Sequence, residues 1–199
     1  MPKILSSLKL GSDRIRQIVL SLRNFSRLDE AQMKQVDIHQ GIDSTLLILQ
    51  HRLKATPNSR GIEVVKEYGN LPLVECYAGQ LNQVFMNVLS NAIDALEESL
   101  SKKPRLRSDR PQIRISTEVI NNHQVVIRIA DNGSGMPEHI KTRIFDPFFT
   151  TKPVGKGTGL GLSISYQIVV CKHSGVFKCN SLPDSGTEFS IQIPITNKV

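Results

Sequence analysis

The hydrophobic pattern predicts one long amphipathic helix near the middle of the chain, over residues 80–100. Apolar residues recur there at intervals of three and four, the spacing of one face of an α-helix. They are Leu81, Val84, Phe85, Val88, Leu89, Ala92, Ile93 and Leu96. We therefore expect a helix that is buried along this face.

Shorter apolar runs predict the remaining elements of a mixed α/β domain. Helical spacing continues over residues 42–53 and 160–171. Runs of alternating or continuous apolar residues predict strands over residues 35–38, 62–68, 113–120, 125–130, 176–182 and 187–195. Two asparagines at 121–122 fit a tight turn, so we expect the strands on either side to form an antiparallel pair.

The first part of the chain reads as one helix over residues 3–31. Its apolar residues form a heptad-like seam of Leu8, Ile15, Ile18, Leu22 and Phe25. A single amphipathic helix is marginal in water and needs a partner. The helix either packs on its own domain or belongs to a dimeric helical bundle. We favour the bundle, which gives a partial dimerisation helix at residues 1–34 and a main domain at residues 35–199.

Composition narrows the class of protein. The net charge is +7, but the basic residues are scattered and only residues 102–110 form a dense cluster. We expect that cluster to be a solvated loop, with attraction for ATP or an acidic partner protein as alternatives, and no nucleic acid as a ligand. No apolar run is long enough to span a bilayer. The sequence has three cysteines and no CxxC motif, which is typical of reduced thiols in a reducing compartment. We therefore expect a cytoplasmic domain of a larger protein that is itself either soluble or membrane-anchored.

Residues 129–162 carry the candidate chemistry. Asp131 ends an apolar strand and is followed by Gly133 and Gly135, so a carboxylate is placed where a flat ring can approach closely. A second glycine cluster over residues 155–161 leads into a predicted helix, and such a helix start offers backbone N–H groups to phosphates. Phenylalanines and threonines join the two clusters. The stretch predicts a nucleotide pocket under a lid.

Three polar residues lie at the edge of the apolar stripe of the long helix. Asn87 and Asn91 are four residues apart and therefore share one side of the helix, and Asp94 lies beside them. Asparagine is a weak helix former that prefers caps and turns. The pair therefore suggests a ligand or metal site, and the alternative is a polar flank that faces water.

Five motifs together carry a resemblance to a known family. Residues 36–199 resemble the catalytic, ATP-binding domain of bacterial sensor histidine kinases, within the GHKL ATPase superfamily, and the preceding helix resembles the second helix of the dimerisation bundle. The motifs occur in the family's order and spacing at residues 87–92 (NVLSNA), 131–136 (DNGSGM), 145–149 (FDPFF), 157–163 (GTGLGLS) and 186–189 (GTEF).

The resemblance implies a two-layer α/β sandwich of the Bergerat type. Its sheet would be mixed and mostly antiparallel, with three main helices on one face and a protruding N-terminal helix. It also implies binding of ATP and Mg²⁺ and transfer of the γ-phosphoryl group to a histidine of the parent kinase, in a two-component phosphorelay. The implied protein partners are the dimerisation and phosphoacceptor domain and the receiver domain of a response regulator. A homodimer of the full-length protein remains open.

The resemblance also implies roles at the base. Asp131 would accept a hydrogen bond from the adenine amine. Thr187 would help to hold the base through its hydroxyl group. Gly133, Gly135 and Met136 would line the same part of the site.

The asparagine motif would act at the phosphates. Asn91 would ligate Mg²⁺ through its amide oxygen, a hard donor that suits this ion. Asn87 stands where ATP-hydrolysing relatives carry a glutamate base, and an amide cannot take a proton from water, so this residue fits transfer to a protein acceptor. Kinases of this family commonly carry a lysine at the position of Asp94. The cation that meets the phosphates must therefore come from elsewhere.

The lid would supply the remaining contacts. Its second glycine motif would hold the phosphates through the backbone of Gly157, Thr158, Gly159, Leu160, Gly161 and Leu162. Lys152 and Lys156 would add positive charge, although Lys152 fits a solvated lid residue equally well. Phe145 and Phe148 would latch a movable lid, with simple core packing as the alternative.

The phosphoacceptor motif of the family has no counterpart in the sequence. Family members carry a histidine followed by an acidic residue and a nearby Pro-Leu, and this context is missing at His39, His51, His123, His139 and His173. We therefore expect a truncated kinase. Two alternatives from other classes are a nucleotide-sensing pseudo-kinase and an ATPase of the gyrase or chaperone kind. Asn87 argues against the ATPase.

Overall fold

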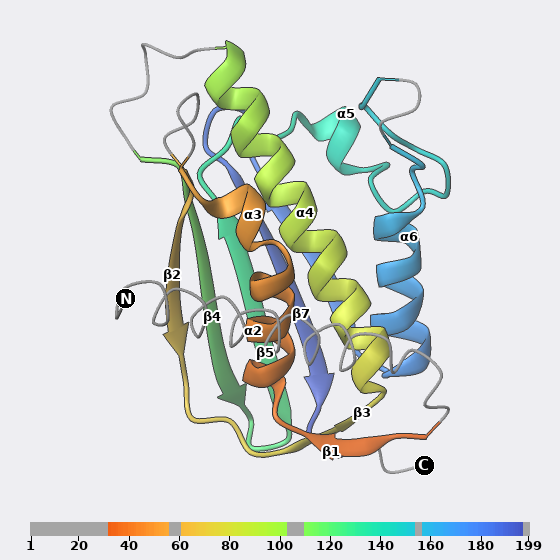
Figure 1. Cartoon of the computed structure of the whole chain (residues 1–199). Helices are drawn as coiled ribbons and strands as arrows, with labels where there is room; N and C mark the ends of the chain where they lie inside the picture. Colours follow the sequence, from red (N-terminus) through yellow and green to blue (C-terminus); the bar gives the residue numbers. More distant parts are fainter. Residues whose placement is uncertain (1–31, 56–60, 103–109, 154–156, 197–199) are drawn as a thin grey trace, which may run out of the picture.

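The computed structural model describes residues 32–55, 61–102, 110–153 and 157–196 (Figure 1). The predicted helix over residues 3–31, most of the basic cluster at 102–110 and Lys156 lie outside the described residues.

The main sheet has five strands in the order β2-β4-β5-β7-β6. These strands are β2 (Glu63–Tyr68), β4 (Gln112–Ile120), β5 (Gln124–Asp131), β7 (Thr187–Pro194) and β6 (Val176–Ser181). The pair β2 and β4 is parallel and the other neighbouring pairs are antiparallel. The predicted mixed, mostly antiparallel sheet is confirmed.

The helices cover one face of this sheet. Figure 1 shows α2 (Ile38–Ile48), α4 (Ala78–Lys102) and α6 (Gly161–Tyr166) lying over the same face, and α6 continues as a π-helical segment, Gln167–Lys172. Two short helices, α3 (Gln50–Leu53) and α5 (Glu138–Lys141), complete the layer. The strands alternate accordingly, since every second residue of β7 is buried against the helices. The prediction of three main helices on one face is therefore confirmed.

The core lies between α4 and the sheet. The apolar stripe predicted for the long helix is buried, and Val84, Val88, Leu89 and Ile93 are each 0% exposed. Among the described residues, no helix combines the length and the apolar character needed to cross a bilayer.

Two element predictions were incomplete. The helix predicted to start at residue 42 begins at Ile38, because the Asp37 side chain caps it by accepting a hydrogen bond from the His39 backbone N–H at 2.8 Å. The short strand β3 (Val74–Cys76) was not predicted, and it pairs with β1 (Lys34–Val36), which the sequence placed at 35–38. Each of these strands has three residues, so their existence depends on the pairing rather than on a local pattern.

Candidate nucleotide-binding site

Three polar side chains lie in a row across adjacent strands, at the end of the sheet where β5 and β6 end and β7 begins. Asp131 on β5 is opposite Thr187 on β7, and Thr187 is opposite Ser181 on β6. The Thr187 and Ser181 hydroxyl oxygens are 2.9 Å apart, and all three residues are buried. Residues that are paired across strands point to the same face, so the row faces the helical layer.

The loop after β5 fixes the Asp131 carboxylate. The Gly133 backbone N–H donates to Asp131 Oδ1 at 2.8 Å, and a Cβ at residue 133 would stand only 2.6 Å from that oxygen. Gly135 has a φ of +63°, and a Cβ there would stand 1.9 Å from the Leu182 carbonyl oxygen. The two glycines of the first motif therefore allow close contacts within the protein, and these contacts set the position of the carboxylate.

Ser181 is a site residue that the sequence analysis missed. Its hydroxyl oxygen accepts a hydrogen bond from the Met136 backbone N–H at 2.8 Å and donates to the Gly186 carbonyl oxygen at 3.0 Å. It thereby joins the first glycine motif to the turn before Thr187. A serine at the end of a strand is common, so nothing in the local sequence distinguished this one.

Asn87 links α4 to the first turn of α6. Its Nδ2 donates to the Gly161 carbonyl oxygen at 2.9 Å and to Ser165 Oγ at 3.1 Å. A Cβ at residue 161 would stand 3.3 Å from the Asn87 amide carbon, so the glycine permits this close approach. The helix therefore places the first asparagine of the motif directly against the second glycine motif.

Asn91 and Asp94, one turn further along α4, share a cation. Lys152 Nζ is 3.1 Å from Asn91 Oδ1 and 2.5 Å from Asp94 Oδ2. On the other side of Asp94, Arg52 Nη2 donates to Oδ1 at 2.5 Å. Burial alone would raise the pKa of Asp94, but the hydrogen bonds from Lys152 and Arg52 hold the pKa below its ordinary value. Asp94 is therefore a charged carboxylate with a cation on each side.

The two ends of the site meet at α4. A Cβ at Gly133 would stand 3.2 Å from the Cβ of Ala95, the residue after Asp94. The row of Asp131, Thr187 and Ser181 on the sheet and the Asn91–Asp94 turn of α4 are therefore neighbours. A nucleotide, which has a base at one end and phosphates at the other, fits such an arrangement.

The two phenylalanines predicted to latch the lid lie in different environments. Phe145 packs against Tyr166 and Phe177, with ring centroids 5.4 and 5.2 Å away, so it anchors the segment to the core. Phe148 is 73% exposed and has a φ of +65°. Gly159, itself at φ +68°, packs against the backbone of Phe148, where a Cβ would stand 2.4 Å from the carbonyl carbon. The second glycine motif is therefore shaped by contact with the phenylalanine motif.

The second glycine motif, residues 157–163, extends in space from the Lys152 side chain to the first turn of α6. A Cβ at Gly157 would stand 3.2 Å from Lys152 Cβ, so this end of the motif lies against the lysine side chain. Leu160 N donates to Thr158 Oγ1 at 3.4 Å, and α6, which contains Leu162, begins at Gly161. The backbone of the motif thus lies between Lys152 and Asn87.

The amide oxygen of Asn91 is a hard donor of the kind that Mg²⁺ prefers. In this structure the oxygen accepts a hydrogen bond from the Lys152 ammonium group. Within the described part of the chain, no group of three or more His, Cys, Asp and Glu side chains is arranged to hold a metal. An ion at Asn91 would therefore take its other ligands from phosphates and water, as Mg²⁺ commonly does.

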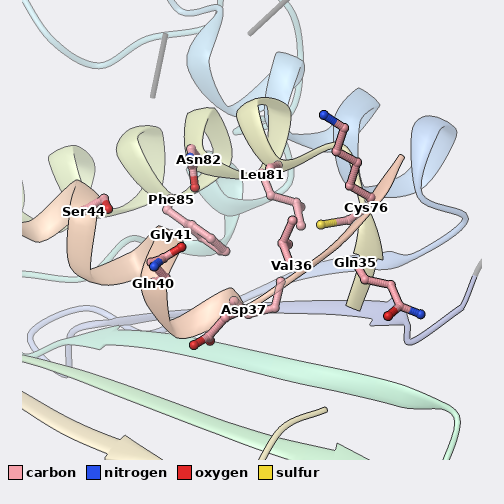
Figure 2. A pocket seen from close by; sticks show the side chains of 13 residues that line it. Gln35, Val36, Asp37, Gln40, Gly41, Ser44, Cys76, Leu81, Asn82 and Phe85 are labelled. Carbon is pink, nitrogen blue, oxygen red and sulfur yellow. The ribbon is translucent and has the colours of Figure 1, made fainter. Parts of the chain in front are cut away.

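A separate pocket of about 210 Å³ lies between β1, α2 and the first turns of α4 (Figure 2). Its lining includes Val36, Asp37, Asn82 and Phe85. It contains none of the site residues predicted from the sequence, so it is a different feature of the fold.

Known proteins resemble this chain in sequence and in fold. Residues 77–197 match the family described as "Histidine kinase-, DNA gyrase B-, and HSP90-like ATPase". The chain is 35% identical over 184 residues to the signal transduction histidine-protein kinase AtoS of Escherichia coli (strain K12), a match that covers 92% of this chain and 27% of that protein. It is 32% identical over 194 residues to the sensor kinase CckA of Brucella abortus (strain 2308), covering 94% of this chain and 20% of that protein.

A solved structure shares the fold. The catalytic domain of the histidine kinase ThkA superposes with a TM-score of 0.67 and 28% identity, over 83% of this chain and 97% of that chain. The chain thus spans 27% and 20% of the lengths of the two curated relatives and nearly all of a catalytic domain.

Proposed function

Because the chain belongs to the family of histidine kinase-, DNA gyrase B- and HSP90-like ATPases, we propose that it is the catalytic domain of a sensor histidine kinase. It would bind ATP with Mg²⁺ and transfer the γ-phosphoryl group to a histidine of its parent protein. The observation that carries this proposal is the contact between Gly133 and Ala95. It brings the strand-end row of Asp131, Thr187 and Ser181, which would hold the base, beside the turn of α4 with Asn91 and Asp94, which would face the phosphates.

The Asp131 carboxylate would select adenine. A carboxylate only accepts hydrogen bonds, and adenine presents an amine donor where guanine presents a carbonyl oxygen. The Gly133 N–H group holds one carboxylate oxygen at 2.8 Å, so the acceptor is positioned before the ligand arrives. The neighbouring Thr187 hydroxyl would add a second contact, fixed in turn by Ser181.

The phosphates would lie between α4 and the second glycine motif. Backbone N–H groups of residues 157–162 would donate to phosphate oxygens, and Lys152 would supply a positive charge. Asn91 would hold Mg²⁺ through Oδ1, and the ion would neutralise charge on the phosphates. Phe148, exposed beside Gly159, would follow the movement of the glycine motif when nucleotide enters or leaves.

Asn87 supports transfer to a protein rather than hydrolysis. Its amide nitrogen is already bound to Gly161 and Ser165, and an amide has no basic site that could accept a proton from water. With positioning and electrostatic stabilisation supplied by the rest of the site, a protein histidine would be the acceptor. Hydrolysis would be slow.

The partners follow from the same proposal. The acceptor would be a dimerisation and phosphoacceptor domain, and the phosphoryl group would then pass to the receiver domain of a response regulator. We infer a cytoplasmic location, because Cys76, Cys171 and Cys179 are free thiols, which persist in reducing compartments.

Calorimetric titration of the purified chain with ATP and GTP, with and without Mg²⁺, tests the proposal. We expect ATP to bind, GTP to bind more weakly, and Mg²⁺ to strengthen ATP binding. Asn91→Ala should abolish the Mg²⁺-dependent part and retain binding of the base. Absence of ATP binding would reject the function. ATP binding without phosphorylation of any acceptor domain supplied in trans would favour a nucleotide-sensing module instead.

A further inference from the structure

We propose that Asp94 is a positioning residue for Lys152, and that Lys152 is the cation that meets the nucleotide phosphates beside Asn91. The inference rests on the proposed function, which already names Lys152 as a positive charge, and adds to it the side chain that directs this lysine to the phosphates. It follows from one group of side chains: Arg52 on α3, Asn91, Asp94 and Glu97 on α4, and Lys152 on the loop between α5 and α6.

Arg52 on α3 fixes the orientation of Asp94. The guanidinium group binds Glu97 in a fork, with Nε 3.3 Å from Oε1 and Nη2 2.6 Å from Oε2. The same Nη2 donates to Asp94 Oδ1 at 2.5 Å. With Oδ1 occupied in this way, Oδ2 is the oxygen that meets Lys152.

The Lys152 side chain reaches from the glycine motif to the asparagine motif. Its stem lies against Gly157, where a Cβ would stand 3.2 Å from both Cβ and Cδ of the lysine. Its ammonium nitrogen lies 2.5 Å from Asp94 Oδ2 and 3.1 Å from Asn91 Oδ1. The charge is therefore held between the two motifs that would enclose the phosphates.

The Lys152 ammonium group has an N–H donor that a ligand can use. It has three N–H donors, and the hydrogen bonds formed within the described part of the chain, to Asp94 and Asn91, use two of them. The third can be donated to a phosphate oxygen without breaking the contact with Asp94. A lysine side chain loses rotamer freedom when it binds a ligand, and the contact with Asp94 removes part of that loss in advance.

The charges of the group agree with this assignment. Arg52 and Lys152 formally balance Asp94 and Glu97, so these four side chains sum to zero charge before the ligand enters. A polyphosphate beside Asp94 would be repelled unless a cation stood between them, and Lys152, which contacts Asp94 Oδ2 and Asn91 Oδ1, is placed to be that cation.

Affinities for ATP and for adenosine separate this inference from the proposed function. Adenosine has no phosphates and therefore reports on the base site alone. We expect Lys152→Ala to weaken ATP binding about tenfold or more, the size of a lost charge-assisted hydrogen bond, and to change adenosine binding by less than about twofold. Asp94→Ala should weaken ATP binding roughly three- to tenfold, because the lysine remains but is no longer directed.

A conservative variant and a matched control complete the test. Asp94→Glu keeps the carboxylate that contacts Arg52 and Lys152, so ATP affinity should stay within about threefold of the original. Lys66→Ala removes another Lys–Asp pair, formed with Asp43 at 2.6 Å on the β2 side of the molecule, and should change neither affinity. Circular dichroism and thermal unfolding establish that each variant is folded.

Two results would overturn the inference while leaving the proposed function intact. Equal loss of ATP and adenosine binding in Asp94→Ala would make Asp94 a structural residue. Stronger ATP binding in Asp94→Ala would mean that the carboxylate sequesters the lysine or repels the phosphates. If the unaltered chain bound neither ligand, the proposed function itself would be wrong. Lys152 lies on a loop, so Lys152→Ala still tests whether this lysine meets the phosphates if the Asp94 variants are unstable.

Discussion

At the scale of single residues, the proposed adenine site depends on the charge of Asp131. Asp131→Asn keeps an oxygen that can accept from the Gly133 N–H group but removes the negative charge. A charge-assisted hydrogen bond is worth about 1.5–3 kcal/mol, so ATP affinity should fall by roughly ten- to a hundredfold. Calorimetry measures this, with circular dichroism as the control for folding. An unchanged affinity would remove Asp131 from the site.

Ser181 on β6 contacts Thr187 and the loop after Asp131, and so stabilises the row formed by Asp131, Thr187 and Ser181. Ser181→Ala would leave the Met136 N–H group and the Thr187 hydroxyl without their buried partner. An unsatisfied buried polar group costs about 1–3 kcal/mol, so the free energy of unfolding should fall by that amount in urea denaturation. Ser185→Ala is a matched control, because Ser185 is exposed and its hydroxyl donates to the Pro183 carbonyl oxygen at the long distance of 3.4 Å. Equal stability of the two variants would refute the role of Ser181.

The residues that sequence reasoning found are those whose type the local chemistry requires. Gly135 and Gly159 have positive φ angles, and Asn87 is an unusual residue for the middle of a buried helix. Ser181 and the Lys152–Asp94 pair gave no such signal. A strand-end serine is ordinary, and the pair joins residues 58 positions apart, so it exists only once α4 and the lid are folded together.

At the scale of elements, the strength of the periodic pattern decided what could be predicted. The long helix was predicted over residues 80–100 and found as α4, Ala78–Lys102, because seven apolar intervals all agree with a helical repeat. The strand β3 has three residues and forms only because β1 pairs with it. The helix after the second glycine motif was predicted as far as Cys171, but its last part is a π-helix, which the apolar spacing does not reveal.

The end of that π-helical segment contains a buried histidine that makes stability depend on pH. His173 Nε2 accepts from the Tyr77 backbone N–H at 3.0 Å, so its proton is on Nδ1, which lies 2.8 Å from the Ile168 carbonyl oxygen. Burial lowers the pKa of His173 below its ordinary value of 6.5, although the Ile168 carbonyl acts in the opposite direction.

The folded state therefore favours neutral His173, and the unfolded state binds more protons as the pH falls through the ordinary value. The free energy of unfolding should decrease from about pH 7 to about pH 5. Denaturation with urea across this range measures the effect. His173→Gln should flatten the profile at a cost in stability, whereas His123→Gln, at an exposed hairpin turn, should retain it. An unaltered slope in His173→Gln would contradict this assignment.

At the scale of the whole molecule, the sheet positions the proposed base site and the helical layer positions the proposed phosphate site. Asp131, Thr187 and Ser181 share one end of three adjacent strands, and α4 carries Asn87, Asn91 and Asp94 past that same end. The family resemblance names the residue types on each of these elements, and the roles that it implies for them at the base and the phosphates stay predictions. The cation held across the boundary between lid and helix depends on packing and was open until the structure was in hand.

The proposed site accounts for nucleotide binding, and we predict that it does not phosphorylate the chain itself. Phosphoryl transfer requires an acceptor in line with the γ-phosphate, and catalysis rests on positioning and charge stabilisation. None of the five histidines in the sequence has the acceptor context, and within the described part of the chain the side chains of His39, His51 and His173 have partners in the fold. His173 is buried between Tyr77 and Ile168, and His39 stacks on Tyr68 with its ring centroid 4.2 Å away.

The chain incubated with γ-labelled ATP and Mg²⁺ should therefore remain unlabelled, and release of inorganic phosphate should be slow because Asn87 cannot act as a base. Adding a separate phosphoacceptor domain of a sensor histidine kinase should give label on that domain, stable in alkali and lost in acid as expected for phosphohistidine. Asp131→Asn should reduce that labelling in parallel with its loss of ATP affinity. Acid-labile label on the chain alone would show that one of its own histidines accepts the phosphoryl group, and replacing the five histidines one at a time would identify it.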